Sequence, residues 1–170
     1  MSGQYVVTFI GDDRTGIVSE MATAIERRGG NWLESQLSQL GGKFAGLILI
    51  SLPDGEAADL QNDLANLPGG HWSVRVTPGN TADAAPEPNL SLEVVGPDRA
   101  GIIREVSLAL AGYGISVITL ESVVESAAFT GELLFKASIA AHAPESDTRA
   151  ELEVKLDDIA ERMTLDIDIS

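Results

Sequence analysis

Two short segments of the sequence contain the residue types that could bind a small charged molecule. Residues 11–18 read GDDRTGIV, and residues 96–103 read GPDRAGII. Each segment places carboxylate and guanidinium side chains ahead of an apolar run with helical spacing. A loop that enters a helix presents unpaired N–H groups and the positive end of the helix dipole, which suit a carboxylate. An aspartate nearby can accept hydrogen bonds from an ammonium group, so the pattern favours a ligand with both groups.

Each of these residues also has a purely structural interpretation. Asp13 and Asp98 could cap the helices that follow them rather than contact a ligand. Arg14 and Arg99 could clamp a carboxylate, or each could pair with the adjacent aspartate and hold its loop. Close backbone approach to a ligand and close helix–strand packing would both explain the glycines in these segments, Gly16 and Gly101.

The composition excludes several kinds of chemistry. The 170 residues include no cysteine, which rules out disulfides, thiolate catalysis and cysteine-ligated metals. The formal net charge is −15, so we expect no direct binding to nucleic acid or to a membrane. His71 and His142 have no other ligand at metal-binding spacing, and we expect no metal or cofactor. The acidic surface is interpreted as mainly solvated, with a docking face for a basic partner as the alternative.

The two loop segments belong to an internal repeat. Five of the seven residues from 11 to 17 recur 85 positions later. The same offset aligns further residues without an insertion, which predicts one fold built twice, over residues 4–77 and 89–169. The additional matches are Ala24 with Ala109, Gly29 with Gly114, Asn31 with Ser116 and Gly46 with Gly131.

The hydrophobic period alternates between the values of a strand and of a helix, in the same order in both units. The first unit is predicted to contain a strand at 5–10, a helix at 17–28, strands at 31–40 and 43–52, a helix at 57–67 and a strand at 72–76. The corresponding segments of the second unit are 90–95, 102–113, 115–126, 131–141, 152–163 and 165–169. This βαββαβ order predicts a ferredoxin-like α+β fold, with both helices on one face of a four-stranded antiparallel sheet. Open sheet edges favour side-by-side packing of the two units.

A stretch with three prolines and no large apolar residue separates the repeats and is predicted to be a linker. The predicted organisation is a first unit at 1–78, a linker at 79–88 and a second unit at 89–170. The formal charge divides between them as −4, −2 and −9. The N-terminus lacks a basic segment and no apolar run could span a membrane, which favours a cytoplasmic protein. The start at Met1 and the finished strand at 163–169 favour a two-unit protein over a piece of a larger enzyme.

Two βαββαβ units that each carry a first loop of the form D-R-x-G-[IV] resemble the ACT domain, a small-molecule-sensing module of amino-acid metabolism. The resemblance covers nearly the whole chain, through GDDRTGIVSEMATAIERRGGNWLESQLSQLGGKFAG and GPDRAGIIREVSLALAGYGISVITLES. It implies a regulatory protein rather than an enzyme, with a small amino acid as effector and glycine as the suggested one. A tandem pair of ACT units with nothing else attached further implies contact with a separate DNA-binding regulator. The resemblance is also compatible with a homo-oligomer.

The resemblance also implies where the ligand binds. In ACT pairs an amino acid typically lies between the first loop of one unit and the start of the second strand of a neighbouring unit. Asn31 matches an asparagine that recurs there in the family, whereas Ser116 is shorter, so we expect the two sites to differ. Thr15 replaces a frequent proline and adds a backbone N–H. The implied ligand-binding residues are Asp12, Asp13, Arg14, Thr15, Gly16, Ile17 and Asn31, with Pro97, Asp98, Arg99, Ala100, Gly101, Ile102 and Ser116.

Two alternative functions use the same fold. A regulatory module of a metabolic enzyme, acting in cis or in trans, would use the same loops. An acylphosphatase-like hydrolase would need an arginine-bearing anion cradle and a group that orients water. Each loop offers a single arginine beside an aspartate that repels phosphate, so the hydrolase fits the sequence less well.

Overall fold

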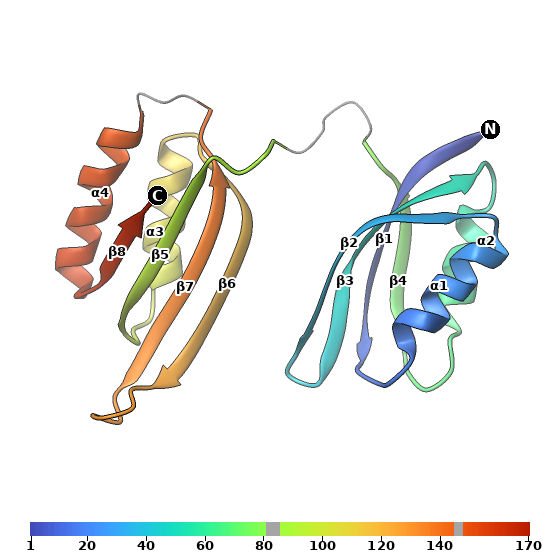
Figure 1. The fold of residues 1–170 in the computed structure, drawn as a ribbon, viewed down its shortest axis with the longest axis horizontal. Helices are drawn as coiled ribbons and strands as arrows, with labels where there is room; N and C mark the ends of the chain where they lie inside the picture. Colours follow the sequence, from blue (N-terminus) through green and yellow to red (C-terminus); the bar gives the residue numbers. More distant parts are fainter. Residues whose placement is uncertain (81–85, 145–147) are drawn as a thin grey trace. The chain divides into compact units, whose positions relative to one another are not determined.

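The computed structural model describes residues 1–80, 86–144 and 148–170. The chain divides into two compact units, residues 1–84 and 85–170. Each unit has the element order βαββαβ, as the sequence predicts (Figure 1). The predicted linker, 79–88, lies partly outside the described residues.

The elements of the first unit follow the predicted segments to within a few residues. They are β1 (Ser2–Asp12), α1 (Ile17–Arg27), β2 (Asn31–Leu40), β3 (Lys43–Pro53), α2 (Ala57–Ala65) and β4 (Ser73–Pro78). The second unit consists of β5 (Leu90–Pro97), α3 (Ile102–Gly112), β6 (Ser116–Ser126), β7 (Leu133–His142), α4 (Thr148–Met163) and β8 (Asp166–Ile169).

Each unit contains one four-stranded antiparallel sheet. The strand orders are β2-β3-β1-β4 and β6-β7-β5-β8, so the first strand of each unit lies in the interior of its sheet. Two helices cover one face of each sheet (Figure 1). The predicted pair of ferredoxin-like α+β units is thereby confirmed.

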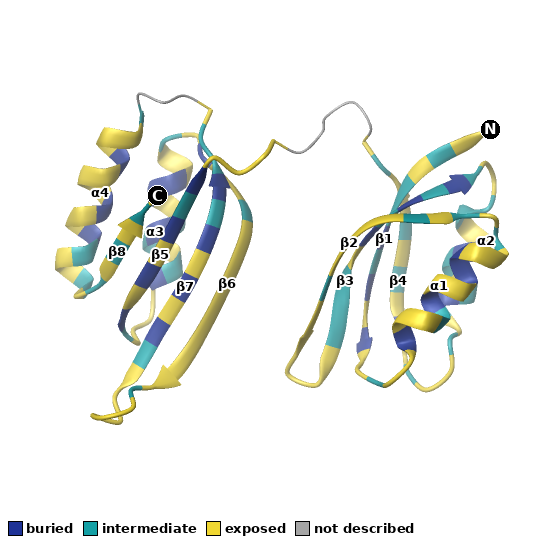
Figure 2. Cartoon of the chain, viewed as in Figure 1, coloured by how far each residue is buried: buried dark blue, intermediate teal, exposed yellow. Residues whose placement is uncertain are grey.

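The core of each unit lies between its sheet and its helices (Figure 2). Alternate residues of the central strands point to this side, because successive side chains of a strand face opposite ways. One helical face of each helix meets them, as the spacing of apolar residues predicts. In the first unit the core includes Val7, Phe9, Met21, Ile25, Ile48, Ile50, Leu52, Leu60, Leu64 and Trp72.

The two units match at an offset of 85 from the first strand through the start of the hairpin. Even the strand irregularity recurs, between Trp32 and Glu34 in β2 and between Val117 and Thr119 in β6. The alignment of Gly46 with Gly131 is wrong, because Gly46 lies within β3 whereas Gly131 lies in the β6–β7 turn. That turn spans residues 127–132 in place of 41–42, and the extra residues shift the offset beyond it.

Candidate ligand-binding loops

The two candidate loops occupy equivalent places, residues 13–16 between β1 and α1 and residues 98–101 between β5 and α3. A backbone hydrogen bond fastens each loop to the hairpin of its own unit. The Asp13 N–H donates to the Gly42 carbonyl at 3.1 Å, and the Asp98 N–H donates to the Leu133 carbonyl at 2.8 Å. The duplicated motif therefore builds the same loop twice.

Both helices begin at a glycine with left-handed backbone conformation. The φ angles are 88° at Gly16 and 97° at Gly101, a region in which any residue with a Cβ is strained. A Cβ at either glycine would meet no other atom within 4 Å. Backbone conformation, and not close helix–strand packing, therefore accounts for glycine at these positions.

Neither α1 nor α3 has a side-chain cap. The capping interpretation of Asp13 and Asp98 is therefore wrong. The cap position falls three residues beyond each aspartate, at Gly16 and Gly101, which have no side chain to accept a hydrogen bond. Among the described residues, the first-turn N–H groups of both helices consequently lack a side-chain acceptor, and they carry the positive end of the helix dipole.

Arg14 is bound by Glu20 of α1 through both guanidinium Nη atoms. The Nη1–Oε1 distance is 2.9 Å, and Nη2 contacts Oε2. This hydrogen bonding lowers the pKa of Glu20 and keeps the pair charged. The expectation that the arginine holds its loop through an ion pair is correct in kind but wrong in partner, because the carboxylate is Glu20 and not Asp13. The Nε atom of Arg14 is buried with no hydrogen-bond partner among the described residues.

The equivalent arginine of the second loop has a different environment. Arg99 is exposed, and it forms no ion pair within the described part of the chain. Glu105, which occupies the place of Glu20, instead accepts a hydrogen bond from Arg162 of α4 at 3.3 Å. The guanidinium of Arg99 is therefore free to meet a carboxylate, whereas that of Arg14 is already engaged.

Asp12 and Pro97 end the strands that lead into the two loops. The Asp12 carboxylate pairs with Lys43 on the neighbouring strand, and the hydrogen bond from Lys43 lowers the pKa of Asp12. Pro97 has no such group. An ammonium ligand at the first loop would therefore compete with Lys43 for Asp12.

The remaining loop residues contribute mainly backbone to the surface. Ile17 and Ile102 are only 3% and 2% exposed, so their side chains belong to the cores. Thr15 and Ala100 are exposed. A ligand at either loop would meet backbone N–H groups and short side chains rather than an apolar pocket.

Asn31 and Ser116 lie at the opposite end of their units from the loops. Asn31 is level with Gln4 of β1 through their common neighbour Ser51, eight residues before Asp12. Eight strand residues span about 26 Å. Ser116 lies opposite His142, near the start of β5. No single unit brings its loop together with residue 31 or 116.

Sequence reasoning missed the residues that pack against the base of each loop. Trp72 lies against Gly11, and a Cβ on Gly69 would come within 3.0 Å of the Arg14 side chain. In the second unit Leu165 takes the place of Trp72 and lies against Gly96. The paired glycines just before Trp72 are the sequence signal for this close approach.

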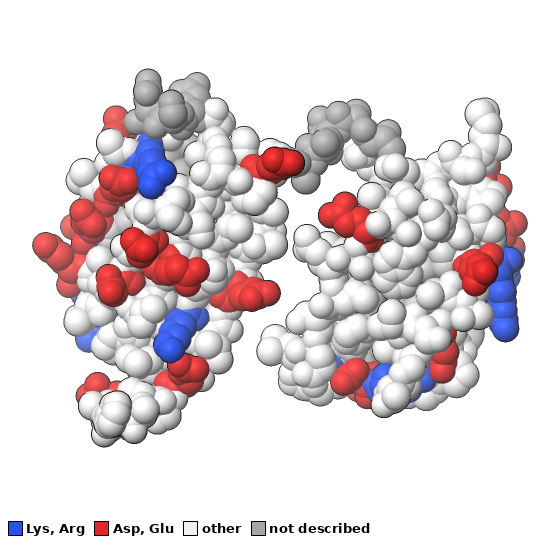
Figure 3. Space-filling view, viewed as in Figure 1, with Lys and Arg blue, Asp and Glu red and all other residues white. Residues whose placement is uncertain are grey.

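Acidic side chains dominate the surface of the second unit. On the face seen in Figure 3 they outnumber basic ones there, in line with a formal charge of −9 for residues 89–170. On the open face of its sheet, Glu93 of β5 lies directly opposite Asp168 of β8. In the described part of the chain, no helix combines the length and apolar character needed to cross a bilayer.

Comparison with known proteins places these two units in a family. The family model described as the ACT domain matches residues 4–70 and 90–170. The chain belongs to the ACT domain family. ACT domains are, in general, regulatory modules that bind amino acids.

Solved structures match the chain over the length of both units. One is an unknown protein from Galdieria sulphuraria, with a TM-score of 0.88 and 29% sequence identity. The match covers 100% of this chain and 98% of that protein's chain. Another is a candidate glycine cleavage system transcriptional repressor, with a TM-score of 0.71 and 18% sequence identity. This match covers 100% of this chain and 97% of that protein's chain. The second comparison confirms the expected resemblance at the level of the fold. No functionally curated sequence matches the chain.

Proposed function

We propose that this chain is a non-enzymatic regulator that binds a small amino acid at its ACT loops. Its first candidate ligand is glycine, and its output is direct contact with a separate DNA-binding regulator. The observation that carries the proposal is the pair of helix starts at Gly16 and Gly101, which have neither a side-chain cap nor any atom within 4 Å of a Cβ position.

The α-carboxylate of the ligand would accept hydrogen bonds from the first-turn N–H groups of α1 or α3. At the second loop, Arg99 adds a guanidinium that no described carboxylate occupies. The aspartates of the loops, Asp13 and Asp98, supply acceptors for the α-ammonium. Because the side chains of Ile17 and Ile102 are buried in the cores, the loops offer mainly backbone groups and short side chains, which fits a ligand with little or no side chain, such as glycine.

Asn31 and Ser116 are too far from the loops of their own units to share a ligand with them. Their part in binding therefore requires a loop from another ACT unit, in this chain or in a second copy. Asn31 offers an amide oxygen and two N–H donors, whereas Ser116 offers one hydroxyl, so the site that contains Asn31 binds more tightly.

Two observations support regulation by contact with a protein. A net charge of −15 opposes binding of this chain to DNA itself, so control of transcription requires a DNA-binding partner. The likeness to a candidate glycine cleavage system transcriptional repressor supports the same output. A hydrolase is disfavoured at the first loop because its arginine is bound by Glu20, and at the second loop because Asp98 beside Arg99 repels phosphate.

A thermal-shift screen of the twenty amino acids on the full chain tests ligand binding. A specific ligand at about one hundred times its Kd stabilises a protein by about 2.7 kcal/mol, enough to raise the melting temperature measurably. We expect glycine, and at most its smallest relatives, to do so. A screen in which no amino acid raises the melting temperature would remove amino-acid sensing from the proposal.

A further inference from the structure

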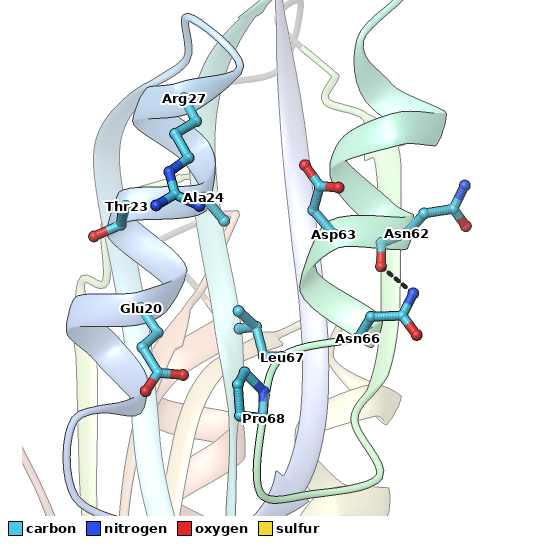
Figure 4. Close-up of a pocket in the computed structure, with 9 residues that line it drawn as sticks. All are labelled: Glu20, Thr23, Ala24, Arg27, Asn62, Asp63, Asn66, Leu67 and Pro68. Atoms are coloured by element: carbon cyan, nitrogen blue, oxygen red, sulfur yellow. Dashed lines mark hydrogen bonds between the residues drawn. The ribbon is translucent and has the colours of Figure 1, made fainter.

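A second polar site lies away from the loops, in a cleft between α1 and α2. The cleft has a volume of about 480 Å³, within the range of about 300–1,000 Å³ that is usual for small-molecule sites. Figure 4 shows Arg27 and Asp63 on its two sides, with Ala24 and Leu67 between the helices. The walls therefore combine charged groups with an apolar floor.

The charges of this cleft are unevenly satisfied. The carboxylate of Glu20 is bound by Arg14, and that of Asp63 by Arg28 Nε at 2.7 Å. These hydrogen bonds lower the pKa of both carboxyl groups, which keeps them ionised. Arg27, by contrast, forms no hydrogen bond or ion pair with any described residue, although its charge also lowers the pKa of Asp63 from across the cleft.

The duplicated unit has an ion pair at the corresponding place between its helices. Glu105 occupies the place of Glu20, and Arg162 of α4 reaches it at 3.3 Å, so an ion pair joins the two helices. In the first unit, Glu20 is turned to Arg14, and the helices are bridged elsewhere, by Arg28 at the end of α1 and Asp63 of α2. The two units therefore place their interhelical ion pairs differently, and Arg27 at the cleft of the first unit has no partner among the described residues.

We propose that the α1–α2 cleft binds a small zwitterion, with its carboxylate on Arg27 and its ammonium toward Asp63 and Glu20. Asp63 binds Arg28 through Oδ2, and its Oδ1 accepts no hydrogen bond from the described residues, so it can accept one from an ammonium group. A simple anion would use only Arg27, and a simple cation only the carboxylates. A molecule that carries both charges satisfies both walls, and its remaining atoms can pack on Ala24 and Leu67. This site borders the first loop only through the Glu20–Arg14 ion pair, and the proposal does not depend on ligand binding by the loops.

Amide NMR titration of the full chain tests the proposal with four probes: glycine, β-alanine, γ-aminobutyrate and ε-aminocaproate. Acetate and methylammonium serve as single-charge controls. Each is used at about 10 mM, which would largely saturate a site with a Kd of about 1 mM. We expect at least one zwitterion to shift the resonances of residues 23–27 and 62–67, and both controls to bind more weakly.

Arg27→Gln should weaken that binding roughly ten- to 100-fold, the loss expected for one charged hydrogen-bonded contact. Arg27→Lys should restore part of it. The matched control is Arg75→Gln, which removes the same charge from β4 and should leave the affinity unchanged. Equal losses in Arg27→Gln and Arg75→Gln would overturn the site, as would the absence of any shift in the cleft. Shifts confined to residues 12–17 and 97–102 would likewise overturn the cleft while supporting the loops.

Discussion

The indole ring of Trp72 lies directly against Gly11, the residue that precedes the charged part of the first loop. A Cβ built on Gly11 would stand 2.3 Å from Trp72 Cε3, far inside van der Waals contact. The ring is 5% exposed and also packs near Phe9, with ring centroids 6.0 Å apart. The base of the loop is thus held by a rigid side chain that directly precedes β4, the last strand of the unit.

Gly11→Ala should destabilise the protein by roughly 1–3 kcal/mol, because the added methyl group has to displace a packed ring. Denaturant unfolding followed by circular dichroism measures the loss. Gly112→Ala is the matched control, since a Cβ there meets nothing within 4 Å and the residue ends α3. The control should be neutral or stabilising by up to about 1 kcal/mol. Equal effects at the two glycines would contradict the packing argument.

Asn31→Ala should reduce affinity for the ligand found in the amino-acid screen by about 1–3 kcal/mol, or roughly five- to 150-fold, because a polar ligand group is left unpaired. Ser116→Ala should cost less. Isothermal titration of both variants, beside Gly16→Val and Gly101→Val as blocks on each loop, separates the sites. Equal losses at Asn31 and Ser116 would mean symmetric sites, and no loss in any of the four would remove the loops from binding.

The isolated protein should not retard duplex DNA in a gel at physiological salt, because its net charge of −15 opposes the phosphate backbone. It is expected to change the mobility of DNA only when a DNA-binding regulator is also present. Tight, salt-dependent binding by the pure protein would contradict this prediction.

Acid should weaken the link between α1 and α2. Arg28 bonds Asp63, Glu56 and Asp59, and the pKa of Asp63 is lowered below its ordinary value of 3.8 mainly by this hydrogen bond. A lowered folded-state pKa stabilises the protein above the ordinary value, and the contribution is lost as the pH falls below it. Solvent exposure of the pair keeps the effect modest. The wild type should therefore have a higher urea midpoint than Arg28→Gln at neutral pH, and this difference should shrink at acid pH. A difference that persists in acid would exclude the ion pair as its cause.

Asp168→Asn should stabilise the second unit by roughly 0.2–1 kcal/mol, because like charges directly opposite on neighbouring strands repel. Glu93, its partner across the strands, accepts a hydrogen bond from Ser138 at 2.6 Å and stays in place. Asp166→Asn is the control, since Asp166 faces Val95 rather than a carboxylate. The gain at position 168 should shrink at high salt. Identical gains at both positions would point to net charge alone.

Periodicity alone predicted the elements because each buries one regular face, as Met21 and Ile25 do in α1. The match of Gly46 with Gly131 failed because a turn can lengthen without changing the period on either side. Side-chain pairing was the least accessible to sequence. Arg14 pairs with Glu20 and not with its neighbour Asp13, because the first turn of α1 brings the Glu20 carboxylate to the Arg14 guanidinium. Trp72 reaches Gly11 across 60 residues, a contact that only the sheet order creates.

The exchange of ion-pair partners between the two copies has an evolutionary consequence. Glu20 binds the loop arginine in one unit, whereas Glu105 binds Arg162 in the other. In a homodimer of single ACT units, every mutation would alter both copies at once. Fusion into one chain lets each copy drift alone, so one can retain an ancestral specificity while the other acquires a new one.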